Sequence, residues 1–139
     1  MIRRSFAWPL LVLLACSSRL PQPETTRHTR ESYLPVPYPP PAGLAETVPP
    51  APRRDGAVWV DGEWVFHGRT YVWQRGGWVY PPPGARFAPW RALYLKSGRL
   101  LLAPGTWYDE ANSPLPPPDV ATPARTPPNE ITAEQQSGR

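Results

Sequence analysis

The stretch AVWVDGEWVFHGRTYVWQRGGWVY, residues 57–80, decides the fold. It contains two copies of one pattern, WVDGEWVF at 59–66 and WQRGGWVY at 73–80, which are 14 residues apart. In each copy a Trp is followed by two residues, a Gly, one further residue, and then Trp, Val and an aromatic residue. Alternating apolar residues interrupted by glycine are typical of short β-strands joined by tight turns.

Three glycine-bearing pairs recur at seven-residue intervals and predict two-residue turns: Asp61 and Gly62, Gly68 and Arg69, Arg75 and Gly76. With these turns, four strands form a meander in which each strand pairs with the next. Side chains alternate between the faces of a strand, so this pairing predicts one row of indoles on one face. The row consists of Trp59, Trp64, Trp73 and Trp78, with Phe66, Tyr71 and Tyr80 two positions along on the same face.

Such a row has two interpretations. If the rings are buried, they form the core, because each aromatic side chain removes about 150–250 Å² from water. If they are exposed, they form a platform for a glycan or a peptide. The candidate binding residues are then Trp59, Trp64, Trp73, Trp78, Tyr71 and Tyr80.

A second group of strands is expected after the proline run at 81–83. These strands cover residues 93–96, 99–103 and 106–109, with turns at Ser97 and Gly98 and at Pro104 and Gly105. Residues 85–91 are expected to be a connection. The predicted fold is therefore all-β, a small antiparallel meander of about seven short strands that forms a curved sheet, a sandwich or a partial barrel.

The N-terminal residues predict where the protein is located in the cell. Arg3 and Arg4 precede an apolar run, 6–15, that is too short to span a bilayer as a permanent helix. The run ends Leu-Leu-Ala-Cys at 13–16, which resembles the lipobox of bacterial lipoproteins. The resemblance implies a signal peptide at 1–15, cleavage after Ala15, diacylglyceryl transfer to the Cys16 sulfur and acylation of the new amine. Ordinary secretion and an uncleaved signal anchor are the alternatives.

Cys16 is the single cysteine, so no disulfide can form within the chain. Several acyl chains on one residue would anchor the protein stably in a membrane. Ser17 stands where an Asp would favour retention in the inner membrane, which indicates the outer membrane of a bacterium with two membranes.

Proline and tryptophan divide the chain into segments. Ten of the 23 prolines lie in 16–56 and seven in 109–139, whereas six of the seven tryptophans lie in 57–108. Proline lacks an N–H donor and has a fixed φ, so it does not extend a β-ladder. We expect a disordered spacer at 16–56, a Trp-rich β domain at 57–109 and a disordered tail at 110–139. Fully extended, the spacer would hold the domain up to about 120 Å from the membrane.

Charge and residue types argue against several function classes. The net charge of +4 includes Arg3 and Arg4 and is scattered, so it does not indicate nucleic-acid binding. Two histidines, His28 and His67, make no metal-ligand set, and no cofactor is expected. Asp61 and Glu63 could serve as a glycosidase pair, but Asp61 is the residue that the predicted turn requires. We therefore expect no catalytic residues.

The runs YVWQRGGW at 71–78 and WVDGEW at 59–64 resemble the YXWGXW-type repeats of bacterial envelope lipoproteins. Gln74 and Arg75 interrupt the short form of that repeat. The resemblance implies an envelope setting and no particular chemistry. We expect a non-catalytic, membrane-anchored lipoprotein that presents a small aromatic module for protein contact or envelope structure. The alternative is a carbohydrate- or peptidoglycan-binding module that uses exposed tryptophans.

Overall fold

The computed structural model of the protein describes residues 19–125. These residues form short strands and one 3₁₀ helix, Arg30–Ser32. The strands are β1 Leu34–Val36, β2 Val58–Val60, β3 Glu63–His67, β4 Thr70–Gln74, β5 Gly77–Val79, β6 Arg86–Ala88, β7 Arg91–Tyr94, β8 Leu100–Ala103, β9 Thr106–Tyr108, β10 Pro114–Leu115 and β11 Val120–Pro123. All the strand pairs are antiparallel, which confirms the predicted all-β, antiparallel class.

The tryptophan repeat folds as one long hairpin. β3 pairs with β4 and β2 pairs with β5, and both pairings fit a single unbroken register from Val58↔Val79 to His67↔Thr70. The predicted pairing of β3 with β4 is confirmed residue for residue. The predicted meander is wrong, because β2 does not pair with β3 and β4 does not pair with β5. The pairs Asp61 and Gly62, and Arg75 and Gly76, face each other midway along the ribbon.

Backbone geometry explains why only one of the three predicted turns forms. Gly68 has a φ of 64°, as a type II′ turn requires at its first central residue. Gly62 and Gly76 are not among the residues with positive φ. A Cβ on Gly76 would instead lie 2.6 Å from the Val60 carbonyl oxygen and 2.7 Å from the Gly62 nitrogen. Glycine serves here to let the two arms of the hairpin approach each other closely.

Residues 86–108 form a second long hairpin. β6 pairs with β9 and β7 with β8, again in one unbroken register from Arg86↔Tyr108 to Tyr94↔Leu100. β6 lies in the segment that was expected to be a connection. Pro104 and Gly105 were expected to turn the chain between β8 and β9, and this prediction is wrong. They lie in the interruption midway along the ribbon, between β8 and β9, which continue in the same direction.

The turn of the second hairpin has three loop residues rather than two. The Gly98 N–H donates to the Leu95 carbonyl, and the Leu95 N–H donates to the Arg99 carbonyl, each at 2.9 Å. The φ of Gly98 is 81°, which matches a type I turn closed by a left-handed residue. The extra loop residue shifts the register by one, so Leu93 pairs with Leu101 instead of the predicted Leu102.

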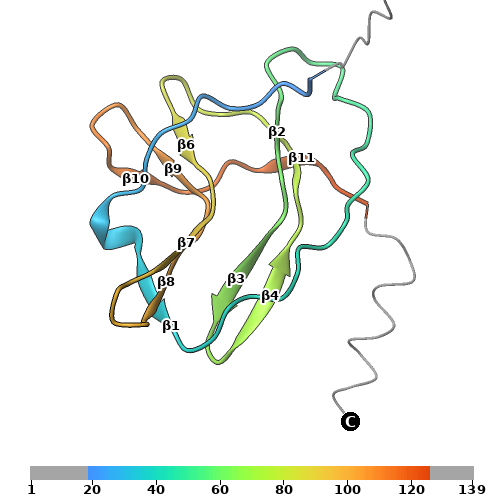
Figure 1. Cartoon of the computed structure of the whole chain (residues 1–139). Helices are drawn as coiled ribbons and strands as arrows, with labels where there is room; N and C mark the ends of the chain where they lie inside the picture. The colour runs from blue at the N-terminus through green and yellow to red at the C-terminus, as the bar shows by residue number, and fades with distance from the viewer. Residues whose placement is uncertain (1–18, 126–139) are drawn as a thin grey trace, which may run out of the picture.

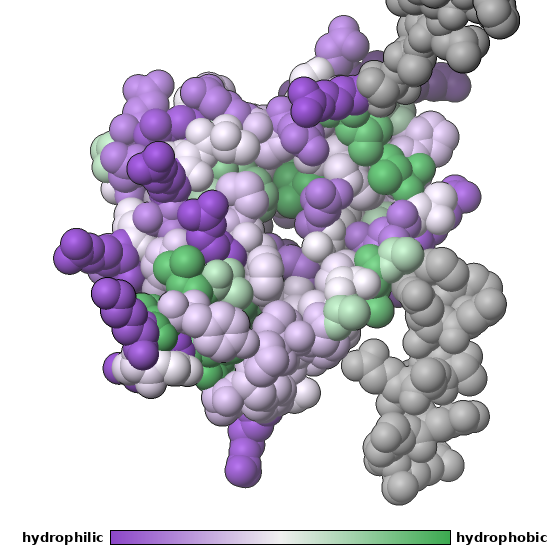
Figure 2. Space-filling model, viewed as in Figure 1, coloured by the Kyte–Doolittle hydropathy of each residue, from purple (hydrophilic) through white to green (hydrophobic). Residues whose placement is uncertain are grey.

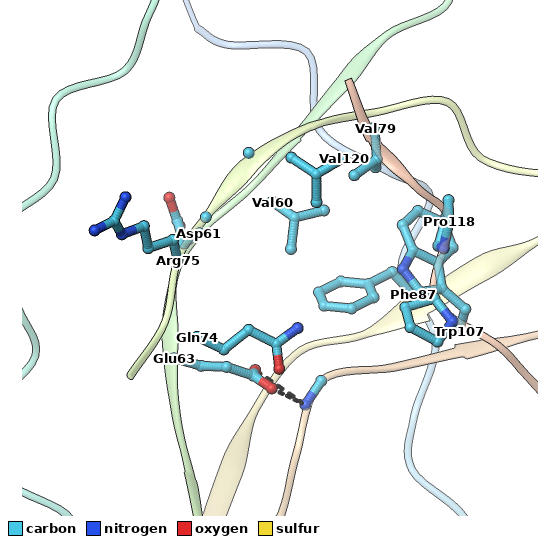
Figure 3. Close-up of a pocket in the computed structure, with 14 residues that line it drawn as sticks. Val60, Asp61, Glu63, Gln74, Arg75, Val79, Phe87, Trp107, Pro118 and Val120 are labelled. Atoms are coloured by element: carbon cyan, nitrogen blue, oxygen red, sulfur yellow. Dashed lines mark hydrogen bonds between the residues drawn. The ribbon is translucent and has the colours of Figure 1, made fainter. Parts of the chain in front are cut away.

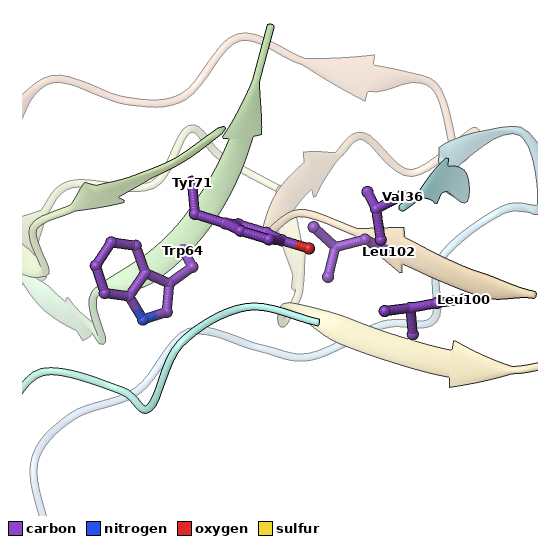
Figure 4. Close-up of a cluster of buried hydrophobic side chains, with 5 residues drawn as sticks. All are labelled: Val36, Trp64, Tyr71, Leu100 and Leu102. Carbon is purple, nitrogen blue, oxygen red and sulfur yellow. The ribbon is translucent and has the colours of Figure 1, made fainter. Parts of the chain in front are cut away.

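Both hairpins run from one end of the molecule to the other (Figure 1), and their turns lie at the same end. The half of each hairpin near its turn belongs to the pair β3–β4 or to the sheet β1-β8-β7. The other half of each hairpin, near the end where residue 19 lies, belongs to the sheet β11-β5-β2 or to the sheet β10-β9-β6. One core cluster joins Trp64 and Tyr71 of the first hairpin to Leu100 and Leu102 of the second and to Val36 of β1 (Figure 4). Another joins Val79 to Trp107 between the other halves.

The flanks of the tryptophan-rich stretch belong to the fold. β1 pairs with β8, β10 pairs with β9, and β11 pairs with β5. The prediction of disorder is wrong for residues 19–56 and 110–125, and the domain extends at least over 19–125 rather than 57–109. The signal peptide, Cys16 and residues 126–139 lie outside the described residues. Within 19–125, no helix has the length and apolar character that a membrane span needs.

Candidate functional site

The four indoles form two pairs in different places. Trp59 and Trp78 meet edge to face with ring centroids 5.6 Å apart, and they pack with Ala124. Trp64 and Trp73 meet in the same way at 5.1 Å, in the cluster that contains Tyr71. The prediction of a single row is wrong. With no turn between Trp59 and Trp64, the two lie five positions apart along one arm, and an odd spacing places side chains on opposite faces.

Most of the predicted platform is buried. The exposed fractions are 3% for Trp59, 7% for Trp64, 2% for Trp78 and 6% for Tyr71. Trp73 and Tyr80 are partly exposed. The rings therefore act as core in this structure, and they offer no continuous open face to a glycan.

The proline-rich segment 38–50, which we call the strap, accepts hydrogen bonds from these rings. Trp64 Nε1 donates to the Ala42 carbonyl and Trp78 Nε1 to the Pro49 carbonyl, each at 2.9 Å. The Tyr71 hydroxyl donates to the Tyr38 carbonyl at 2.8 Å. In Figure 1 the strap is the teal segment that passes beside β4. The strap thus meets the aromatic N–H and O–H donors with backbone carbonyls, a group that every residue has and that proline also retains.

A carboxylate from the strap completes this contact. Glu46 Oε1 accepts the Trp73 indole N–H at 2.9 Å, and Glu46 Oε2 accepts the backbone N–H of Gly76 at 2.9 Å. Leu44 and Val48 on either side pack into core clusters. The inward residues 44, 46 and 48 alternate with period two. That alternation was the one signal in the sequence that could have identified the strap as a folded element.

A second carboxylate, Glu63, occupies the equivalent place between the two hairpins (Figure 3). Its oxygens accept the backbone N–H of Gly105 at 2.9 and 3.0 Å. Burial raises the pKa of Glu63 above its ordinary value, and the hydrogen bond from Gly105 lowers that pKa in part. The Asp61 carboxylate, in turn, accepts the Trp59 indole N–H at 2.7 Å. Both members of the considered glycosidase pair thus hold structural hydrogen bonds.

Two cavities border Glu63. One has a volume of about 180 Å³ and is also lined by Trp59, Pro89 and Trp90, and the other is smaller. Val60, Val79, Phe87 and Trp107 form its apolar wall, and Glu63 and Gln74 lie on its polar side (Figure 3). Its volume is about 60 Å³. One water needs at least about 10–15 Å³ of such volume, so this smaller cavity can take a few waters and not a sugar ring.

The two histidines have separate surroundings. His28 Nε2 lies 2.7 Å from the Pro89 carbonyl, to which it donates, and His67 is exposed at the end of β3. Among residues 19–125, no three His, Cys, Asp or Glu side chains are grouped in a way that could hold a metal ion.

Exposed apolar and basic side chains meet where the two hairpins turn. We call this region the tip surface. Its apolar members are Tyr94, Tyr38, Leu95 and Leu93, with exposed fractions of 68%, 43%, 41% and 39%. Its basic members, Arg69, Lys96 and Arg99, are also exposed. In Figure 2, apolar green atoms lie between charged purple side chains at the β7–β8 end of the molecule.

Tyr38 joins the strap to the turn of the first hairpin within the tip surface. The Tyr38 hydroxyl donates to the Arg69 carbonyl at 2.8 Å, and the Tyr38 ring lies 5.5 Å from that of Tyr71. Burial raises the pKa of the Tyr71 phenol, and the neighbouring phenols of Tyr38 and Tyr94 raise it further. The phenol of Tyr71 thus lies near the two tyrosines of the tip surface, Tyr38 and Tyr94.

Comparison of this chain with protein-family models, curated proteins and solved structures found no match. Function is therefore inferred from the residues and their geometry.

Proposed function

We propose that this chain is a non-catalytic, lipid-anchored protein of the bacterial cell envelope, attached to the outer membrane through Cys16. Its β domain sits close to the membrane surface and presents its tip surface to a protein partner. The lipobox-like sequence at 13–16 supports the anchor.

The observation that carries this proposal is the early start of the fold. The Pro21 carbonyl accepts the backbone N–H of Trp59 at 2.7 Å, and Pro21 lies only five residues after Cys16. Five extended residues span at most about 17 Å. A lipid on Cys16 would therefore hold the domain against the headgroups, because the proline-rich strap is folded onto the domain and adds no length to the tether.

The position of the N-terminal end of the domain determines which surface faces away from the membrane. Residue 19 and the hairpin turns lie at opposite ends of the molecule (Figure 1). An anchor at Cys16 would thus place the turns on the side away from the bilayer. That side carries the exposed apolar and basic residues of the tip surface, and exposed apolar groups rimmed by polar ones are typical of protein-contact sites.

Glycan binding, the alternative, finds less support. It requires open aromatic rings, and Trp59, Trp64 and Trp78 are each at most 7% exposed. Their N–H groups already donate to Asp61, Ala42 and Pro49. Titration with soluble peptidoglycan fragments would test this alternative, since a shift in tryptophan emission would favour it.

The anchoring part is tested by membrane fractionation and by mass spectrometry of the mature N-terminus. Wild-type protein is expected in the outer-membrane fraction with diacylglyceryl and acyl groups on Cys16. The Cys16→Ala variant is expected to lose this modification and the attachment. Attachment of Cys16→Ala that equals wild type would refute the anchor.

The short tether is tested by energy transfer to a dye in the bilayer surface. The donor dye is attached to Asp55→Cys, near the end where residue 19 lies, or to Ser97→Cys, in the turn of the second hairpin. Because lipidation blocks the Cys16 thiol, the introduced cysteine is the only free thiol for the dye. Transfer is expected to be strong from position 55 and weak from position 97. Weak transfer from both positions would restore the long-spacer interpretation.

A further inference from the structure

We propose that the tip surface binds the acidic, partly apolar face of a protein partner. This inference rests on the proposed function and adds the chemistry of the partner.

Charge is distributed unevenly along the chain. Between Glu63 and Asp109 there is no acidic residue, and the same stretch contains six cations. They are Arg69, Arg75, Arg86, Arg91, Lys96 and Arg99. Three of the six, Arg69, Lys96 and Arg99, lie at the two turns and belong to the tip surface. A local excess of one charge attracts partners of the opposite charge and speeds their association.

The tip surface also exposes apolar side chains, which a partly apolar partner would cover. The run Leu93-Tyr94-Leu95 is at least 39% exposed at each position. It covers the end of β7, and β7 is the edge strand of the sheet β1-β8-β7. An edge strand with exposed leucines and a tyrosine is prone to unwanted association unless a partner covers it. Tyr and Arg are also the residue types enriched in protein interfaces.

A lipid surface offers the same combination of acidic and apolar groups, but geometry argues against it. The tether from Cys16 to Pro21 is short, and the turns lie at the end of the molecule opposite residue 19. The anchored domain therefore cannot turn its tips into the bilayer that holds it. A protein on the far side is the occupant that the charge and the orientation together favour.

The test uses the full-length, lipidated protein in its own cells. A photo-crosslinking amino acid replaces Tyr94 in the tip surface or, as a matched control, Val120, which is 50% exposed on β11. We expect a protein adduct from position 94 only, with crosslinked peptides rich in Asp and Glu. An adduct formed with lipid, with glycan or with a second copy of this chain would overturn the inference, as would no adduct at all.

Charge reversal then tests the partner that the adduct identifies. The double variant Lys96→Glu, Arg99→Glu is expected to bind the purified partner about tenfold or more weakly, and Lys96→Arg, Arg99→Lys is expected to bind like wild type. Wild-type binding should weaken as salt rises. Equal binding by the three proteins would overturn the inference. Membrane fractionation of the same cells separates the two proposals. If the protein that retains Cys16 is absent from the membrane fraction, the anchor is refuted, whatever adduct forms at position 94.

Discussion

Glu63 on β3 accepts the backbone N–H of Gly105 at 2.9 Å, and so joins the first hairpin to the second where both ribbons are interrupted. The strap makes the corresponding contact through Glu46 and Gly76 at 2.9 Å. At both places a glycine N–H that has left the strand ladder is bound by a carboxylate. A buried N–H without an acceptor would cost free energy, so these two carboxylates stabilise the interruptions that the long hairpins require.

Glu63→Ala is expected to lower the free energy of unfolding by about 1–3 kcal/mol, because it leaves the Gly105 N–H without its acceptor. Glu63→Gln keeps a side-chain oxygen in that place and is expected to cost less. Urea denaturation followed by tryptophan emission measures both values. Equal losses in the two variants would show that the contact with Gly105 contributes little.

The same carboxyl makes stability depend on pH. Burial raises the pKa of Glu63 in the folded protein above the ordinary value of 4.5. As pH rises from the unfolded pKa to the folded pKa, the unfolded chain loses this proton first, so the free energy of unfolding falls and then levels off. Glu63→Gln removes this contribution. Wild-type stability minus Glu63→Gln stability is therefore expected to decrease as pH rises from the unfolded pKa through the raised folded pKa, and an increase would contradict the assignment.

Glu46→Ala tests whether the strap is held by its carboxylate. The variant removes the acceptor of both the Trp73 indole and the Gly76 N–H. We expect a loss of about 1–3 kcal/mol and faster acrylamide quenching of tryptophan, because the strap then covers the rings less firmly. Asp119→Ala, at an exposed carboxylate, is the control and should change neither quantity. Quenching equal to that of wild type in Glu46→Ala would argue that the strap is held by its backbone contacts alone.

Gly76→Ala tests the close approach of the two arms. Its Cβ would lie 2.6 Å from the Val60 oxygen and 2.7 Å from the Gly62 nitrogen, and both are backbone atoms that cannot rotate away. A loss of about 1–3 kcal/mol is expected, as for other overpacked sites. Gly43→Ala, where an added Cβ meets no atom within 4 Å, should be neutral by comparison. The measurement is the midpoint of thermal unfolding of the two variants. Equal midpoints for Gly76→Ala and Gly43→Ala would show that Gly76 is not needed for the close approach of the two arms.

Some of the fold could be predicted because it depends on near neighbours. Alternating side chains around Gly68 identified β3, β4 and their register, since a two-residue turn sets the pairing of the strands that it joins. The same local rule failed at Ser97, where one extra loop residue moved the register by one position.

The sequence by itself determined that this chain is all-β, where most of the central strands lie, and which segment resembles a lipoprotein leader. Only the tertiary structure decided that Asp61-Gly62 and Arg75-Gly76 lie opposite each other across a ribbon, that the tryptophans fall into two separate pairs, and that the proline-rich strap is folded. The physical reason is that a glycine suits both a turn and a close backbone contact. Likewise, the strap is held by indole and phenol donors that are distant in the sequence, and the alternation at 44, 46 and 48 does not show which donors meet its carbonyls.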